Sequence, residues 1–140
     1  MPRLPIYVAS AVSDDRIVAV RPLVDSGAEY SVLDGTVALE LGWSEQDIAR
    51  NALDTRPITG VGRAAAPLIA YQHVLTALIS LGRLYAMMRL SVFLTSPNTL
   101  SMPVLGRRDF FRQVDFALIE AEQRFYLRFR DRSVLRDSLE

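Results

Sequence analysis

Leu23-Val24-Asp25-Ser26-Gly27-Ala28 places an acid directly behind two apolar residues and in front of a Ser-Gly-Ala turn. This pattern indicates a carboxylate that a buried strand delivers onto a tight turn. Gly27 allows an unusual backbone conformation or the close approach of another segment, and the Ser26 hydroxyl can brace the turn. Because Asp-Ser-Gly is also common in ordinary turns, the motif alone leaves a purely structural turn open.

Two further motifs follow along the chain, and each also has a structural interpretation. Ile58-Thr59-Gly60-Val61-Gly62 has glycines at alternate positions. They let a hairpin tip bend and bring its amides close to an extended peptide, although a flexible turn without a ligand also fits. Val104-Leu105-Gly106-Arg107 indicates a buried strand that ends at glycine, followed by a short helix over residues 107–113.

In order and spacing, the three motifs resemble the retropepsin-like family of retroviral-type, single-domain aspartic proteases, over about residues 4–129. The resemblance implies that Asp25 is catalytic and that residues 58–62 form a flap over the substrate. It implies a catalytic loop supported by Ser26, Gly27 and Ala28. Three features depart from the family pattern: Ser26 stands where Thr is commoner, the stretch between flap and second motif is longer, and the tail beyond Phe129 has no assigned counterpart.

The same resemblance assigns roles to residues around the loop. The strand that ends at Gly106 is expected to pass beneath the aspartate loop, and Glu29 is expected to form a structural ion pair with Arg107. The implied substrate pocket is apolar and is lined by Leu23, Ala28, Ile58, Pro97 and Val104.

The expected fold is a mainly β, single-domain, retropepsin-like closed β-barrel with a glycine-tipped flap hairpin and one or two short helices. Residues 1–129 are predicted to form the domain, and residues 130–140 a polar C-terminal tail that is frayed or helical. Expected strands cover 6–9, 17–20, 67–71, 74–81, 84–94, 116–119 and 124–129, and expected helical segments cover 36–42 and 44–51.

Composition excludes several kinds of site. The chain of 140 residues has no cysteine, which excludes thiolate chemistry and disulfides, and its single histidine, His73, excludes a multi-histidine metal site. Sixteen basic residues balance sixteen acidic ones, so no global field favours nucleic acid. Every basic residue is Arg, a bias typical of GC-rich genomes, and a prokaryotic member of the family is expected. No metal, cofactor or membrane partner is expected, and the predicted location is the cytoplasm.

A single carboxylate cannot supply both the base and the acid that peptide hydrolysis requires. Because the chain has one Asp-Ser-Gly-Ala motif, an enzyme would need a homodimer in which two copies of Asp25 meet across a two-fold axis and share a proton. The substrate would be an extended peptide or protein. Two alternatives remain from the sequence: a catalytically silent retropepsin-fold module for dimerisation or peptide binding, and a β-barrel that binds a small ligand.

Overall fold

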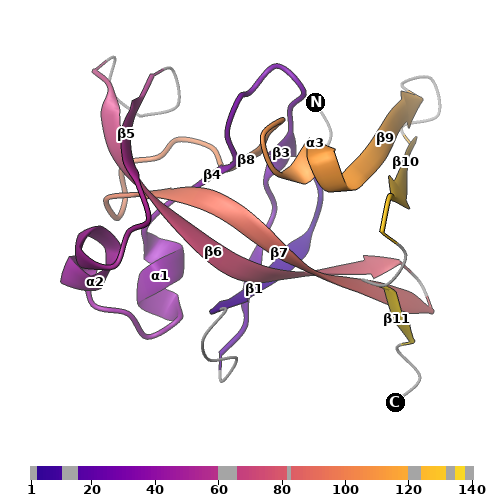
Figure 1. The fold of residues 1–140 in the computed structure, drawn as a ribbon, viewed down its shortest axis with the longest axis horizontal. Coiled ribbons are helices and arrows are strands. Elements are labelled where there is room, and N and C mark those ends of the chain that lie inside the picture. Colours follow the sequence, from indigo (N-terminus) through magenta and orange to yellow (C-terminus); the bar gives the residue numbers. More distant parts are fainter. Residues whose placement is uncertain are drawn as a thin grey trace.

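The computed structural model describes residues 3–10, 16–59, 66–81, 83–119, 124–131 and 135–137 of the chain. Its main body is a strongly curled half-barrel sheet with three short helices, as Figure 1 shows. The mainly β class is therefore confirmed, with three helices where one or two were expected. Within the described residues, no helix is long and apolar enough to cross a membrane.

The large sheet contains nine strands among the described residues. Seven follow one another in the order β2-β1-β6-β7-β4-β8-β3, while β5 pairs with β6 and β11 pairs with β7. Their bounds are β1 (Ile6–Ser10), β2 (Val18–Val20), β3 (Leu23–Val24), β4 (Val32–Leu33), β5 (Thr55–Ile58), β6 (Leu68–Leu81), β7 (Leu84–Thr95), β8 (Val104–Leu105) and β11 (Leu135–Asp137).

The β6–β7 hairpin is the longest feature of the sheet and crosses the whole molecule. The sequence suggested separate runs before and after Gln72-His73, but both residues continue the ladder with β7. Both side chains have a hydrogen-bond partner within the protein, as buried polar groups require. The Gln72 side-chain amide donates to Ser91 Oγ at 2.7 Å. A ring nitrogen of His73 lies 2.7 Å from the carbonyl oxygen of Ile48.

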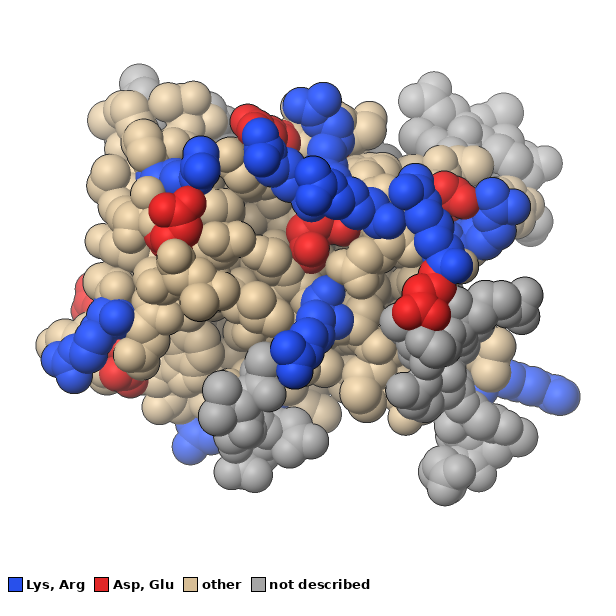
Figure 2. All heavy atoms as spheres, viewed as in Figure 1, with Lys and Arg blue, Asp and Glu red and all other residues tan. Residues whose placement is uncertain are grey.

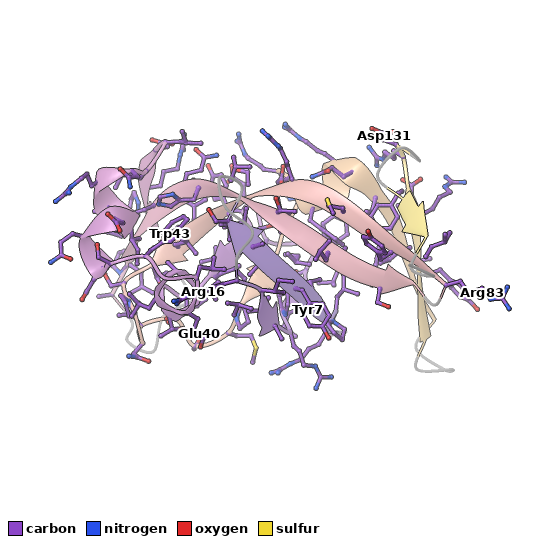
Figure 3. All side chains as sticks on the ribbon, turned by 90° about the horizontal axis from the view of Figure 1, so that it is seen from below. Tyr7, Arg16, Glu40, Trp43, Arg83 and Asp131 are labelled. Atoms are coloured by element: carbon purple, nitrogen blue, oxygen red, sulfur yellow. The ribbon has the colours of Figure 1, made fainter. Side chains whose placement is uncertain are left out.

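The described residues form three short helices: α1 (Thr36–Glu40), α2 (Glu45–Arg50) and α3 (Phe110–Gln113). Helix α2 begins with a capping box, in which the Ser44 and Asp47 side chains each accept the other's backbone N–H. Figure 3 shows Trp43 near the α1–α2 end of the molecule and Arg83 at the opposite end, in the turn of the β6–β7 hairpin.

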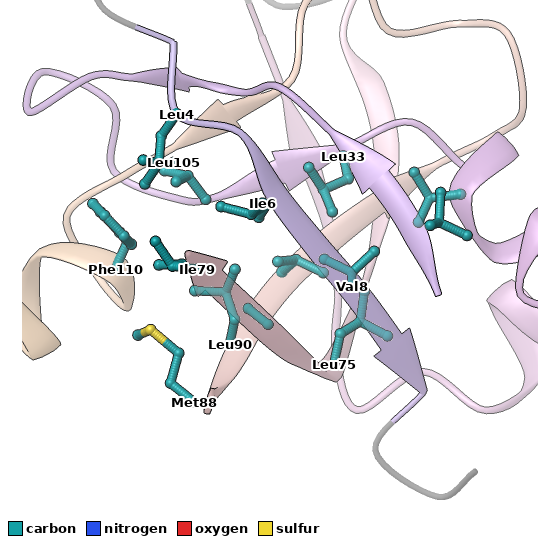
Figure 4. Close-up of a cluster of buried hydrophobic side chains, with 14 of the residues drawn as sticks. Leu4, Ile6, Val8, Leu33, Leu75, Ile79, Met88, Leu90, Leu105 and Phe110 are labelled. Atoms are coloured by element: carbon teal, nitrogen blue, oxygen red, sulfur yellow. The ribbon is translucent and has the colours of Figure 1, made fainter. Parts of the chain in front are cut away.

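The main hydrophobic core fills the inside of the curled sheet (Figure 4). Alternate residues of β7 point into it, since Ala86, Met88 and Leu90 are buried while Met87 and Arg89 between them are exposed. Strand β1, strand β6, strand β8 and helix α3 contribute further fully buried side chains: Ile6, Val8, Leu75, Ile79, Leu105 and Phe110. The largest side chains of this core therefore tie α3 to the sheet.

The C-terminal part differs from the prediction in one respect. Strands β9 (Val114–Ile119) and β10 (Arg124–Phe129) form the expected hairpin as a separate two-stranded sheet. Residues 135–137, expected to be frayed or helical, instead form β11 along β7. Strand β7 pairs with β4 only at Phe93 and Leu94, so its opposite half offers an unpaired edge that the tail can complete.

Candidate active site

Asp25 stands at the end of β3, where the strand meets its turn. The backbone N–H of Asp25 donates to the carbonyl oxygen of Leu105 at 3.0 Å, which extends the parallel β3–β8 ladder to the acid. The turn then closes on the same residue, because the N–H of Gly27 donates to Asp25 Oδ1 at 2.9 Å and that of Ala28 to the Asp25 carbonyl oxygen at 3.1 Å. The half-buried carboxylate is thus fixed by strand and turn together.

Gly106 lies where the segment after β8 passes the aspartate loop. A Cβ at this position would lie 2.5 Å from the carbonyl oxygen of Tyr30 and 2.8 Å from that of Ala28. Both are backbone atoms, so a larger residue would have to push the two segments apart. The N–H of Gly106 donates to the buried hydroxyl of Ser31 at 3.0 Å, which ties β8 to the loop. Only glycine allows this passage beneath the loop.

The ion pair near the loop corrects one prediction. Glu29 was expected to pair with Arg107, but among the described residues it pairs with Arg108, whose Nη2 lies 2.7 Å from Glu29 Oε1. The backbone register is the reason. The N–H of Arg107 donates to the carbonyl oxygen of Ala28, and the N–H of Arg108 donates to the carbonyl oxygen of Glu29. Arg108 therefore lies opposite Glu29, one residue later than the motif suggested.

A cavity of about 390 Å³ opens beside Asp25. Three of the residues expected in the substrate pocket line it, namely Ala28, Ile58 and Val104, together with Thr59 of the expected flap. Two others lie elsewhere. The N–H of Leu23 donates to the carbonyl oxygen of Pro103 within the sheet, and Pro97 packs against Gly35. Tyr30, Val32 and Pro57 line the pocket instead, in addition to Asp25, Gly27 and Glu29.

The expected flap begins at β5, which pairs with the first part of β6 from Thr55 opposite Tyr71 to Ile58 opposite Leu68. Ile58 is buried in a second small core cluster with Val32, Ala70, Phe93 and Leu100. Gly60, Val61 and Gly62 lie outside the described residues. The described base of this hairpin forms one wall of the cavity beside Asp25.

A second carboxylate, which the sequence analysis did not single out, follows β4 at Asp34. Asp34 accepts the backbone N–H of Thr36 and Asn98 on Oδ2, and those of Thr99 and Leu100 on Oδ1, at 2.9–3.0 Å. Burial by itself raises the pKa of Asp34, but the N–H donors of Leu100, Thr36 and Asn98 outweigh it and hold the pKa below its usual 3.8.

The sequence contained a signal for this residue. Val32-Leu33-Asp34-Gly35 repeats the apolar-apolar-acid pattern that precedes the first turn. The described residues contain no group of three or more histidine, aspartate or glutamate side chains that could hold a metal ion.

Comparisons with known proteins give one informative result. No family model matches the chain, and no curated protein matches it. Among solved structures, the chain is similar to one described as EIAV protease complexed with the inhibitor HBY-793. The two share 18% identity with a TM-score of 0.44, over 76% of this chain and 81% of that chain. The likeness concerns the fold alone.

Proposed function

We propose that this chain is one subunit of a homodimeric, retropepsin-like aspartic endopeptidase in which Asp25 of each copy supplies half of a catalytic dyad. One observation carries the proposal. Asp25 lines an open pocket, and among the described residues its carboxylate accepts a single hydrogen bond, from Gly27 of its own turn. A carboxylate has about four acceptor sites, so most of its capacity remains for water, substrate or a second carboxylate.

The pocket of one copy lacks a second catalytic acid among its described residues. Glu29 is the other acid in its wall, and its Oε1 lies 2.8 Å from Nε and 2.7 Å from Nη2 of Arg108. That pairing gives Glu29 a structural partner. Because hydrolysis needs a base and an acid at the same bond, the second carboxylate has to come from another copy of Asp25 across a two-fold axis.

In this arrangement the two carboxylates hold one proton between them, since two like charges so close cannot both persist. The ionised carboxylate takes a proton from a bound water, whose oxygen attacks the carbon of the scissile carbonyl. The protonated carboxylate donates its proton to the carbonyl oxygen. When the tetrahedral intermediate collapses, the C–N bond breaks and the amine nitrogen takes up a proton from the dyad, while a hydroxyl of the intermediate returns a proton to the dyad as its C=O bond forms.

The walls of the pocket indicate how a peptide would lie. Ala28, Ile58 and Val104 present apolar surface beside Asp25, while Thr59 stands at the end of β5. An extended peptide could pair its backbone with the β5–β6 hairpin, as peptides do in strand addition. Apolar side chains next to the bond that is cut are expected from this lining.

The experiment exposes a mixture of unstructured peptides to the native protein and identifies the products by mass spectrometry. Asp25→Asn should lower the rate of cleavage by about a thousandfold, while Asp115→Asn, an exposed change on β9, should leave it unchanged. Sedimentation should show a dimer of the native protein. Equal cleavage by native and Asp25→Asn proteins would contradict the proposal. A stable dimer that cuts no peptide would instead favour a silent dimerisation or peptide-binding module.

A further inference from the structure

A second cavity, of about 310 Å³, lies beside the Asp25 pocket and has charged walls. We call it the arginine cavity and define it by the lining residues Tyr30, Asp54, Arg56, Arg108, Asp109 and Arg112. Three guanidinium groups from β5, from the segment after β8 and from α3 thus surround one hollow. Figure 2 shows that arginine side chains gather on this face of the molecule in a band.

Two of these arginines are held in place by partners that leave most of their donors unused. Arg56 Nε donates to Asp54 at 2.8 Å, and Arg108 bonds to Glu29, in pairs whose side chains are about half exposed. Both guanidinium groups also lie over the ring of Tyr30, 5.6 and 5.4 Å from its centre. Each guanidinium has five N–H donors, so both remain able to bind an anion.

Arg112 differs from Arg56 and Arg108 in its carboxylate partners. Among the described residues it forms no ion pair within 4.0 Å, and its charge acts on Asp109 only from a distance. Asp109 also lines the cavity; burial raises its pKa, and its Oδ2 accepts the N–H of Ser91 at 2.6 Å. The cavity lining therefore contains three arginines against two aspartates, and among the described residues Arg112 belongs to no ion pair.

The arginine cavity and the Asp25 pocket are neighbours that share walls. Tyr30 lines both the pocket and the cavity. Its neighbours in sequence are divided between them, since Glu29 and Val32 line the pocket and Ser31 lines the cavity. Strand β5 continues in the same way from Arg56 in the cavity to Ile58 in the pocket. A peptide that lies extended in the pocket, with successive residues about 3.3 Å apart, therefore passes the mouth of the cavity within a few residues.

We propose that the arginine cavity binds the carboxylate of an Asp or Glu side chain in an extended peptide whose neighbouring residues lie in the Asp25 pocket. The path of the peptide rests on the proposed function, whereas the anion site rests on the three arginines. A planar guanidinium binds a carboxylate through two parallel hydrogen bonds, which a neutral amide side chain cannot match. The substrate class that follows is peptides with an acidic residue a short distance from an apolar cut site.

The test measures binding to the Asp25→Asn protein, so that no peptide is cut. Fluorescent octapeptides with apolar central residues carry one Glu at each outer position in turn, and each has a counterpart with Gln. At one position the Glu peptide should bind about tenfold more tightly than its Gln counterpart. Arg112→Gln should abolish this preference, and Arg50→Gln, in the last turn of α2, should keep it.

The inference is overturned by the absence of a Glu–Gln difference at every position, by a difference that persists in Arg112→Gln, or by no binding of any peptide. Free glutamate at millimolar concentration should compete with the Glu peptide weakly; if it abolishes the preference at the peptide's own concentration, the cavity serves a free anion and the peptide assignment is wrong. Cleavage of the same peptides by the native protein is read separately. Cleavage without a preference for Glu would support the protease function and refute the acidic subsite. A preference for Glu in binding without any cleavage would support the acidic subsite and refute the protease function.

Discussion

Two aspartates nine residues apart follow similar pairs of apolar residues in the sequence but have different surroundings in the fold. Asp25 follows Leu23-Val24 at the end of β3, and Asp34 follows Val32-Leu33 at the end of β4. Both strands flank β8, and both pair with it at Val104, β3 in parallel and β4 in antiparallel orientation. Each acid is followed closely by a glycine and a change of chain direction.

The difference lies in what the protein offers each carboxylate. Asp34 accepts four backbone N–H groups, three of which come from the segment Asn98–Leu100 that folds over it. Among the described residues, Asp25 accepts one backbone N–H group, from Gly27, and its carboxylate faces a pocket. A carboxylate whose oxygens are filled by the protein's own amides holds loops together, whereas one with free acceptor sites beside a cavity is available for chemistry.

The glycines beside the two acids should give the largest contrast in stability. A Cβ at Gly35 would collide with the backbone carbonyl oxygen of Thr95, whereas at Gly27 it would lie 3.1 Å from Asp25 Oδ1, a side-chain atom that can move. Gly35→Ala should therefore lower the free energy of unfolding by about 3 kcal/mol, and Gly27→Ala by less than about 1 kcal/mol. Gly27→Ala should instead slow peptide cleavage, because it displaces the carboxylate. Urea denaturation and cleavage rates measure the two effects. Equal losses of stability in the two variants would contradict the proposed difference between Gly35 and Gly27.

Removing the carboxylates themselves should give a smaller contrast of the same kind. Asp34→Ala leaves four backbone N–H groups without their acceptor, and about 2 kcal/mol of stability should be lost because water reaches only some of them. Asp25→Ala removes one hydrogen bond at an exposed turn and should change stability by less than about 0.5 kcal/mol. Comparable losses in denaturant titrations of the two variants would mean that Asp34 is no more structural than Asp25.

Acid should weaken the Asp34 contribution in a predictable direction. Because the folded pKa of Asp34 lies below its unfolded value of 3.8, its stabilising effect is complete above 3.8 and is lost as the pH falls through the folded pKa. The stability difference between the native protein and Asp34→Asn should therefore shrink on acidification below pH 3.8. Denaturant titrations at a series of pH values measure it, and a difference that grows in acid would contradict the proposed hydrogen bonding.

Much of this arrangement was predictable from local pattern. The strand before Asp25, the strand that ends at Gly106 and the helix after it follow from apolar pairs next to glycine and polar residues. The pattern could not separate Asp25 from Asp34, because the distinction depends on where residues 98–100 fold. The residues next to Asp34 in the sequence carry no sign that residues 98–100 will fold over its carboxylate.

The register between paired segments was the other feature that the sequence did not predict. The motif suggested Arg107 as the partner of Glu29, but the backbone bonds between residues 28–29 and 107–108 put Arg108 opposite it. A shift of one residue turns the neighbouring side chain to the other side of an extended segment. The pairing of β11 with β7 was missed for a related reason, since an edge becomes available only once the rest of the sheet is formed.

The central claim, that one site is built from two copies of Asp25, can be tested by mixing. Native and Asp25→Asn proteins are unfolded together in equal amounts and refolded, so that subunits combine at random. If both carboxylates are needed, only dimers of two native chains are active, and total activity should fall to about one quarter of that of the same total amount of native protein. A parallel mixture with Asp115→Asn should keep full activity. An activity of one half would show that each chain works with its own Asp25 alone, and would contradict the shared site.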